Sequence, residues 1–159
     1  MKISSTVREM YVKGNLAELC EAVEFYSGSI PASGDIAPTG VRLAVARKFM
    51  LAQIPGASNF GEFIWTSVSL GSVEAKPCDI DGNILTGVVQ SMPAVATGVI
   101  GYAYLGSSYP AGSNPTGENT FRVYATVGTS AAEIIVPSLS VTVGSSVAIN
   151  VMRLSLRSS

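Results

Sequence analysis

Apolar and polar residues alternate along most of this chain, which is the pattern of half-buried β-strands. The clearest case is the segment 136–156, where apolar residues alternate with Ser and Thr: Leu139, Val141 and Val143 against Ser138, Ser140 and Thr142. Gly144 and Ser145 follow, and a Gly in this position is typical of the tight type II′ turn that joins two strands. The segment therefore predicts a β-hairpin that closes at Gly144.

The same period of two continues through the rest of the chain after residue 22. It predicts strands at 22–27, 41–47, 62–70, 72–76, 84–91, 97–105, 120–127, 133–143 and 146–156. Gly, Pro and Asp-Gly-Asn turn signals separate these segments, and no pattern of helical crossovers lies between them. Many short strands in this arrangement predict a mainly β fold, an antiparallel β-sandwich or jelly roll.

The first 22 residues predict one or two short helices instead. Thr6 and Glu9 have the spacing of a capping box, and the apolar residues Val7 and Met10 follow at helical spacing. Gly14 can end this helix, and a second short turn then reaches about residue 22.

A chain of 159 residues fits a single domain. We therefore expect one domain over 1–159, with a helical segment at 1–22 and a β-sandwich at 23–159.

Charged residues are scarce, and the basic ones are scattered without forming a run. They make up 13% of the chain, about half of the roughly 25% typical of soluble proteins, and the net charge is −1. Because nucleic acid is bound by clustered cations and no basic cluster occurs, we expect no nucleic-acid partner. A surface covered by Ser, Thr, Gly and Ala favours packing against neighbouring subunits.

Membrane insertion and export signals are not predicted. The longest apolar stretches, such as 95–105, are interrupted by Gly and Thr and fall short of the roughly 20 residues that span a bilayer. The N-terminus lacks the apolar block and cleavage site of a signal peptide. We expect no membrane partner, and synthesis in the cytoplasm of the host cell.

The residue inventory argues against catalysis. The sequence contains no His, which removes the commonest general base and metal ligand and excludes Ser-His-Asp and Cys-His arrangements. Of the two cysteines, Cys20 follows an apolar rhythm and is expected as a small buried hydrophobe, and Cys78 as a thiol in a loop or at a strand end. We therefore predict no enzyme and no catalytic, cofactor-binding or metal-binding residues.

Carboxylates leave two alternatives open. Asp79 and Asp81 alternate on one face of an extended segment, and a glycosidase needs only two carboxylates across a cleft, with Glu62, Glu74 and Glu118 as further candidates. Asp81-Gly82-Asn83 is better explained as a hairpin turn. The same run begins like an EF-hand loop, but Ile84 and Gln90 occupy the positions that need Gly and Glu, which leaves only a loose calcium site made from loops.

One long segment and a single Trp elsewhere in the chain are candidates for contacts with partners. The segment 106–119 is long for a connection in a compact domain, and it is either an interface arm or a mobile loop. The candidate interface residues are Tyr109, Pro110, Asn114 and Trp65.

Aromatic and glycine residues in the strands have alternative interpretations. The aromatics could form a platform for sugars, although packing within the sheet is the commoner role of aromatic residues in strands: Tyr26, Trp65, Tyr102, Tyr104 and Tyr124. The glycines in Gly98-Val99-Ile100-Gly101 indicate a bulge or a close backbone approach.

Several motifs in order resemble one group of proteins. The stretch Val23–Asp35 (VEFYSGSIPASGD) resembles I-x-I-Y-S-G-x-x-P-A-S-x-D, and Thr39–Ala44 (TGVRLA) resembles T-G-x-x-L-A. Ala96–Tyr102 is similar to A-x-G-x-x-x-(aromatic), and Thr126–Ile134 (TVGTSAAEI) to T-V-G-T-S-G-A-D-L. These patterns, with the closing hairpin, are those of small structural proteins of tailed bacteriophages. Ala131 and Glu133 depart from the pattern, which has Gly and Asp there.

The resemblance implies a structural protein of the phage particle and implies no catalytic residues. We expect an oligomeric virion protein that contacts other copies of itself and other virion proteins, as a capsid decoration or stabilising protein or as a head-tail or tail component. The alternative is a tail-associated module that binds host-surface carbohydrate. The sequence leaves the position in the particle, the copy number and the symmetry open.

Overall fold

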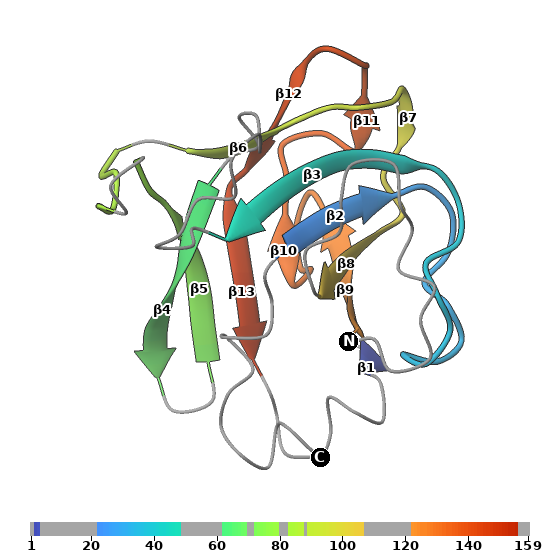
Figure 1. Ribbon diagram of the computed structural model, residues 1–159, viewed down its shortest axis with the longest axis horizontal. Coiled ribbons are helices and arrows are strands. Elements are labelled where there is room, and N and C mark those ends of the chain that lie inside the picture. Colours follow the sequence, from blue (N-terminus) through green and yellow to red (C-terminus); the bar gives the residue numbers. More distant parts are fainter. Residues whose placement is uncertain are drawn as a thin grey trace, which may run out of the picture.

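A computed structural model shows a mainly β protein, which confirms the predicted class (Figure 1). The structure describes residues 2–3, 22–48, 62–69, 72–79, 83–87, 89–106 and 122–155. This described part contains thirteen strands and no helix. The strands are β1 (Lys2–Ile3), β2 (Ala22–Tyr26), β3 (Arg42–Lys48), β4 (Glu62–Ser69), β5 (Ser72–Pro77), β6 (Gln90–Pro93), β7 (Gly98–Val99), β8 (Tyr102–Gly106), β9 (Arg122–Gly128), β10 (Ile134–Ile135), β11 (Ser140–Val141), β12 (Ser146–Ile149) and β13 (Val151–Ser155).

Nine of these strands form one large sheet in the order β1-β9-β10-β13-β5-β4-β3-β2-β8. Because β8 also pairs with β9, the sheet curves back on itself and is nearly closed. The remaining four strands form two short ribbons, β6 with β12 and β7 with β11, which lie together at one end of the molecule (Figure 1). We predicted two facing sheets, and the structure has this single curved sheet with two ribbons instead.

Two of the strand pairs are parallel, so the prediction of a purely antiparallel sheet is wrong. β3 runs parallel to β4, and β9 runs parallel to β10. Each parallel contact is only two residue pairs long. Such short contacts leave no parallel run that a hydrophobic pattern could reveal.

The core lies inside the curved sheet and beneath the ribbons. In β2, Val23 and Phe25 point into it, and both are fully buried. They pack in one cluster with residues from the other strands, among them Leu43, Phe63, Met92, Leu105, Val123, Ile134, Val141, Ile149 and Met152. Burial of this much apolar surface is the main stabilising term of the fold.

The predicted hairpin at 136–156 is wrong, and although a turn lies at Gly144, it is not the predicted type II′ turn. Gly144 has φ of +83°, and the Ser145 amide donates to the Thr142 carbonyl at 3.0 Å. Gly144 is therefore the third residue of the turn, which suits a type II turn. The strands on either side do not pair with each other, because β11 pairs with β7 and β12 pairs with β6.

The predicted N-terminal helices fall mostly on residues 4–21, outside the described residues. The described residues on both sides are in strands: Lys2 and Ile3 pair with β9, and Ala22 begins β2. A helix up to residue 22 is therefore not supported.

Candidate functional site

Among the described residues, a group of buried polar side chains lies on the outer face of β2, β8 and β9. Alternate residues of these strands place four tyrosines together: Tyr26, Tyr102, Tyr104 and Tyr124. Tyr26 stacks on Tyr102 with ring centroids 5.6 Å apart, and Tyr102 meets Tyr124 edge to face at 5.6 Å. All four are at most 1% exposed. We call this group the tyrosine cluster.

Hydroxyl groups of the cluster hold the connection 27–41, which joins β2 to β3. The Thr39 amide donates to the Tyr102 hydroxyl at 2.8 Å, and that hydroxyl donates to the Thr39 carbonyl. The Tyr124 hydroxyl donates to the Ile36 carbonyl at 2.6 Å. These bonds fix a long connection against the outside of the sheet.

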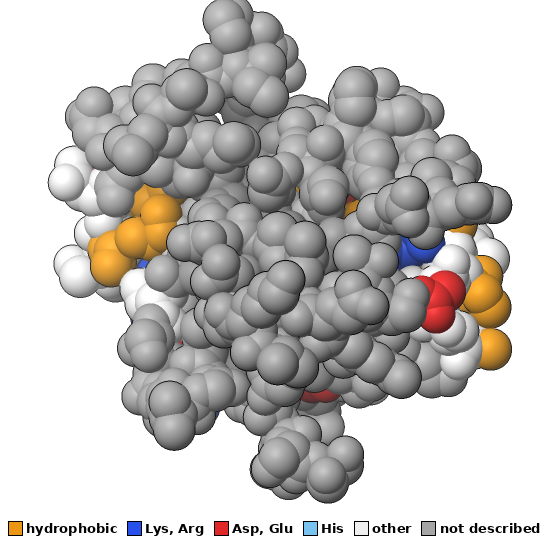
Figure 2. Space-filling view, turned by 60° about the horizontal axis from the view of Figure 1, so that its bottom comes forward, with side chains coloured by type: hydrophobic (Ala, Val, Ile, Leu, Met, Phe, Trp, Pro, Cys, Tyr) orange, Lys and Arg blue, Asp and Glu red, His pale blue; other side chains and the backbone are white. Residues whose placement is uncertain are grey.

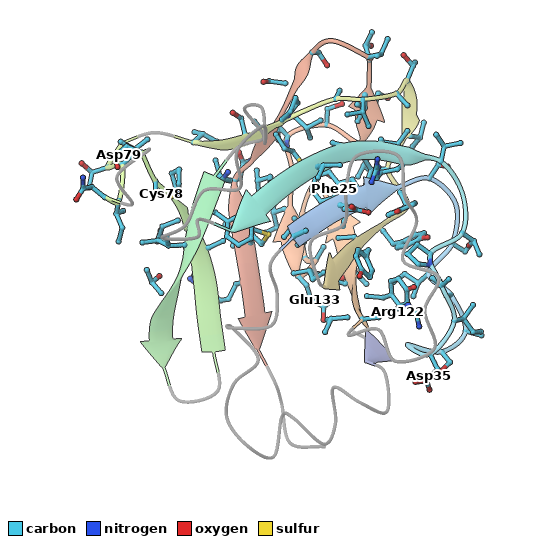
Figure 3. All side chains as sticks on the ribbon, in the orientation of Figure 1. Phe25, Asp35, Cys78, Asp79, Arg122 and Glu133 are labelled. Carbon is cyan, nitrogen blue, oxygen red and sulfur yellow. The ribbon has the colours of Figure 1, made fainter. Side chains whose placement is uncertain are left out.

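Arg122 adds a cationic hydrogen bond to the same connection. Its side chain, 2% exposed, donates from Nη1 to the Asp35 carbonyl at 2.9 Å. Figure 3 shows Arg122 and Asp35 on the same side of the molecule. The connection is thus held at Asp35, Ile36 and Thr39.

A buried carboxylate lies beside the cluster. Glu24 is 1% exposed; it accepts a hydrogen bond from the Tyr26 hydroxyl at 2.7 Å and forms an ion pair with Arg42 at 3.2 Å. A buried charge is stable only when it is paired and hydrogen-bonded, and Glu24 has both partners.

Burial keeps these tyrosines neutral. It raises the pKa of Tyr26 well above the ordinary value of 10.0, and the negative charge of Glu24 raises it further. Burial also raises the pKa of Tyr124 and of Tyr102, although the bonds to Thr39 partly offset the effect for Tyr102. The neutral hydroxyls of Tyr102 and Tyr124 are bonded to the backbone and that of Tyr26 to Glu24, so these groups stabilise the fold rather than act as acids or bases.

A second local motif lies where β9 leads into β10. The Glu133 carboxylate accepts hydrogen bonds from the Thr126 amide at 2.7 Å and from the Thr126 hydroxyl at 3.1 Å. Ala131, between them, has φ of +50°, in the left-handed region that favours Gly. The loop therefore places Ala where the related pattern has Gly.

Among the sequence-predicted interface residues, only Trp65 belongs to a described strand. It lies in β4 opposite Ala75 of β5. Tyr109, Pro110 and Asn114 lie outside the described residues, as does the whole segment 107–121.

The sugar-platform interpretation is wrong for the four clustered tyrosines, because a stacking platform must be exposed. They pack against one another inside the molecule, as the alternative predicted. The close approach predicted for the Gly98–Gly101 segment is confirmed. A Cβ at Gly101 would lie 1.7 Å from the Gly28 carbonyl oxygen, and one at Gly98 would lie 2.8 Å from Leu43.

The carboxylates that suggested catalysis have structural partners. Asp79 accepts a hydrogen bond from the Asn83 amide at 2.8 Å, which closes a turn after β5. Glu74 forms ion pairs with Lys76 and Arg153. Asp81, Glu118 and Cys20 lie outside the described residues. Cys78 is buried just after β5, as expected for a strand-end thiol.

A small pocket opens between β5 and the junction of β12 with β13. It encloses about 140 Å³, and its lining includes Glu74, Lys76, Gln90 and Asn150. Gln90 is buried, and its Oε1 has no hydrogen-bond partner within the part of the chain that the structure describes. Ligand pockets usually enclose about 300–1,000 Å³, so this one suits water or a very small polar molecule.

The described residues contain no group of three or more His, Cys, Asp or Glu that could hold a metal ion. No helix among them is long and apolar enough to cross a membrane.

Sequence reasoning missed the tyrosine cluster as a unit. Alternation along the strand places Tyr102 and Tyr104 on one face, but it does not show that Glu24, Arg42 and Arg122 join them. The available signal was in β2, where Glu24 and Tyr26 alternate with apolar residues that are buried on the other face.

Comparison of the chain with protein-family models, with curated proteins and with solved structures finds no match.

Proposed function

We propose that this chain is an oligomeric structural protein of a bacteriophage particle, which decorates or stabilises the capsid or completes a head-tail or tail structure. It acts through protein-protein contacts and is synthesised in the host cytoplasm. The main support is the resemblance of its ordered motifs to those of small phage structural proteins, which runs from residue 23 into the closing segment.

One observation carries the proposal at the level of structure: motif residues hold loops in place. Thr39 in the 27–41 connection is held by Tyr102, and Glu133 in the loop between β9 and β10 is held by Thr126. Motif residues used in this way fit a protein that acts by presenting a fixed surface to other proteins. In a catalytic motif, polar groups face a cleft that can admit a substrate.

In this proposal the curved sheet holds the 27–41 connection and the end ribbons in place, and these supply the contacts with other proteins. Fixing the connection 27–41 before assembly lowers the entropy lost when that surface becomes ordered in an interface.

The test is to find the protein in particles. Phage particles are purified on a density gradient from a lysate of a host that carries the gene, and their proteins are quantified by mass spectrometry. We expect a constant ratio of this chain to the major capsid protein across the particle fractions. A chain found only in the soluble fractions would contradict the proposal.

An add-back experiment measures the same function directly. Particles from a phage that lacks the gene are mixed with the purified chain, which we expect to bind until a fixed copy number is reached. In parallel, the wild type and the variants Trp65→Ala and Tyr109→Ala are applied to a glycan array. Glycan binding that either variant abolishes, without binding to particles, would favour the carbohydrate-binding alternative.

A further inference from the structure

The two short ribbons at one end of the molecule are built from stretches without charge. No Asp, Glu, Lys or Arg occurs between Asp81 and Glu118, and none between Glu133 and Arg153. The first stretch contains β6 and β7, and the second contains β11 and β12, which pair with them. The fold thus brings two uncharged stretches together at the upper end in Figure 1.

Figure 2 brings the bottom of the molecule forward, and among the described side chains visible in it, basic groups in blue and acidic groups in red lie beside hydrophobic groups in orange at the right-hand edge.

The β7–β11 ribbon has one inner and one outer face. Gly98 and Val141 are paired and face inward: Val141 is 4% exposed, and Gly98 lies against Leu43. Val99 and Ser140, the next pair, therefore point outward, because side chains alternate along a strand. Val99 is 60% exposed.

Two further valines lie beside this outer face. Val143 is 58% exposed, and its amide donates to the Thr97 hydroxyl at 3.0 Å, next to β7. Val95 is 41% exposed and follows Ala94, which exchanges backbone hydrogen bonds with Gly144 and Ser145. We call Val95, Val99, Ser140 and Val143 the neutral face.

The chemistry of the neutral face indicates its occupant. In a twofold-symmetric contact, the same surface patch of each subunit faces the other. A charged residue near the symmetry axis would then lie opposite an identical charge, unless a residue of opposite charge were placed beside it. A patch of valine and serine has no such repulsion and can pack against its own copy. Depletion of charge is also what distinguishes the centre of a protein-protein interface from the rest of the surface.

We propose that the neutral face is the contact surface between two copies of this chain. Val99 lies at its centre and is covered by the partner. This inference deepens the proposed function and takes its biological meaning from it, but it is tested on the purified chain alone.

The experiment compares two exposed valines. Sedimentation equilibrium is measured for the wild type, for Val99→Asp and for the control Val89→Asp. Val89 is 55% exposed, similar to Val99, but it lines the pocket beside Glu74 and Lys76. We expect the wild type to dimerise with a dissociation constant of about 100 μM or lower. Val99→Asp should weaken the dimer at least tenfold, and Val89→Asp should leave it unchanged.

Two further measurements keep the result interpretable. Ser140→Asp places a charge at a second exposed position and should also weaken the dimer, with thermal unfolding showing whether each variant folds. Mixing Val99→Asp with Val99→Lys should restore association, since opposite charges then meet across the contact. A monomeric wild type, equal weakening by Val89→Asp, or no restoration in the mixture would each overturn the inference.

The two proposals can fail separately. A chain that dimerises through Val99 but does not bind particles contradicts the proposed function alone. A chain that binds particles and associates with itself equally well after Val99→Asp contradicts this inference alone.

Discussion

Tyr124 illustrates how single side chains in this protein serve two environments. Its ring lies in the tyrosine cluster, in contact with Tyr102 and Tyr104, and its hydroxyl reaches the Ile36 carbonyl. A buried hydroxyl needs such a partner, because leaving it without one costs about 1–3 kcal/mol. The partner here is a backbone carbonyl, which no change of side chain in the connection can remove.

We predict that Tyr124→Phe lowers the free energy of unfolding by about 1 kcal/mol at pH 7, through loss of this hydrogen bond. The difference should shrink above pH 10. The pKa of Tyr124 is higher in the folded protein than in the unfolded chain, so its contribution to stability is complete at pH values below the unfolded-state pKa of 10.0. This contribution is lost as the pH rises above 10.0 toward the folded-state pKa. Urea unfolding at pH 8 and pH 10.5 measures both effects. An equal difference at the two pH values would show that Tyr124 is not shielded from ionisation.

At the scale of elements, the contact between Gly28 and Gly101 joins the start of the 27–41 connection to the start of β8. The Gly101 amide donates to the Tyr26 carbonyl at 2.8 Å, and a Cβ at Gly101 would collide with the Gly28 carbonyl. The backbone carbonyl cannot move aside as a flexible side chain could. The contact therefore requires Gly at position 101.

Gly101→Ala should destabilise the protein by about 3 kcal/mol, because it overpacks a backbone contact. Gly28→Ala is the matched control at the other side of the contact. Its φ of +87° is unfavourable for Ala, but no atom lies within 4 Å of the added Cβ, so it should cost only about 1–2 kcal/mol. Chemical denaturation of both variants gives the comparison. A larger loss for Gly28→Ala would show that backbone conformation, not the collision, dominates here.

The sequence pattern located the strands of the N-terminal half, but it did not show which strands pair with one another. The predicted strands at 22–27, 41–47, 62–70 and 72–76 match β2 to β5 within one or two residues. The predicted strand at 120–127 matches β9, whereas the one at 84–91 is wrong except at its end, where β6 begins. The predicted strands at 97–105, 133–143 and 146–156 are each divided, because the chain changes partner within them. At Ile100 and Gly101 it leaves β11 for β2, and at Asn150 it leaves β6 for β5 and β10. Apolar residues continue across both changes, so the alternation cannot show where a strand ends.

The site was less predictable than the strands. Alternation in β2, β8 and β9 shows which residues share a face, but not that the outer face is also buried. That depends on the 27–41 connection folding over it, which is held by Tyr102, Tyr124 and Arg122 from distant parts of the sequence. Such long-range pairing leaves no local signal.

At the scale of the whole molecule, the curved sheet is held together by pairing between neighbouring strands, and ion pairs between strands add to this pairing. Glu74 in β5 forms ion pairs with Lys76 on the same strand at 2.5 Å and with Arg153 of β13 at 2.9 Å. Arg153 and Glu74 are also paired in register. This ion pair therefore joins β5 to β13, which are neighbours in the sheet.

The link should make stability sensitive to acid. Hydrogen bonds from Lys76 and Arg153 hold the pKa of Glu74 below its ordinary value of 4.5. Its contribution to stability is therefore complete above that value and is lost as the pH falls through the lowered pKa of the folded state. Glu74→Gln should cost less than about 1 kcal/mol at pH 7, because both cations are partly exposed to solvent. Urea unfolding at pH 7 and pH 3 should show the variant and the wild type converging in acid, and 0.5 M NaCl at pH 7 should narrow their difference as well. A difference that persists unchanged at pH 3 would mean that Glu74 stabilises the junction of β5 and β13 by packing rather than by charge.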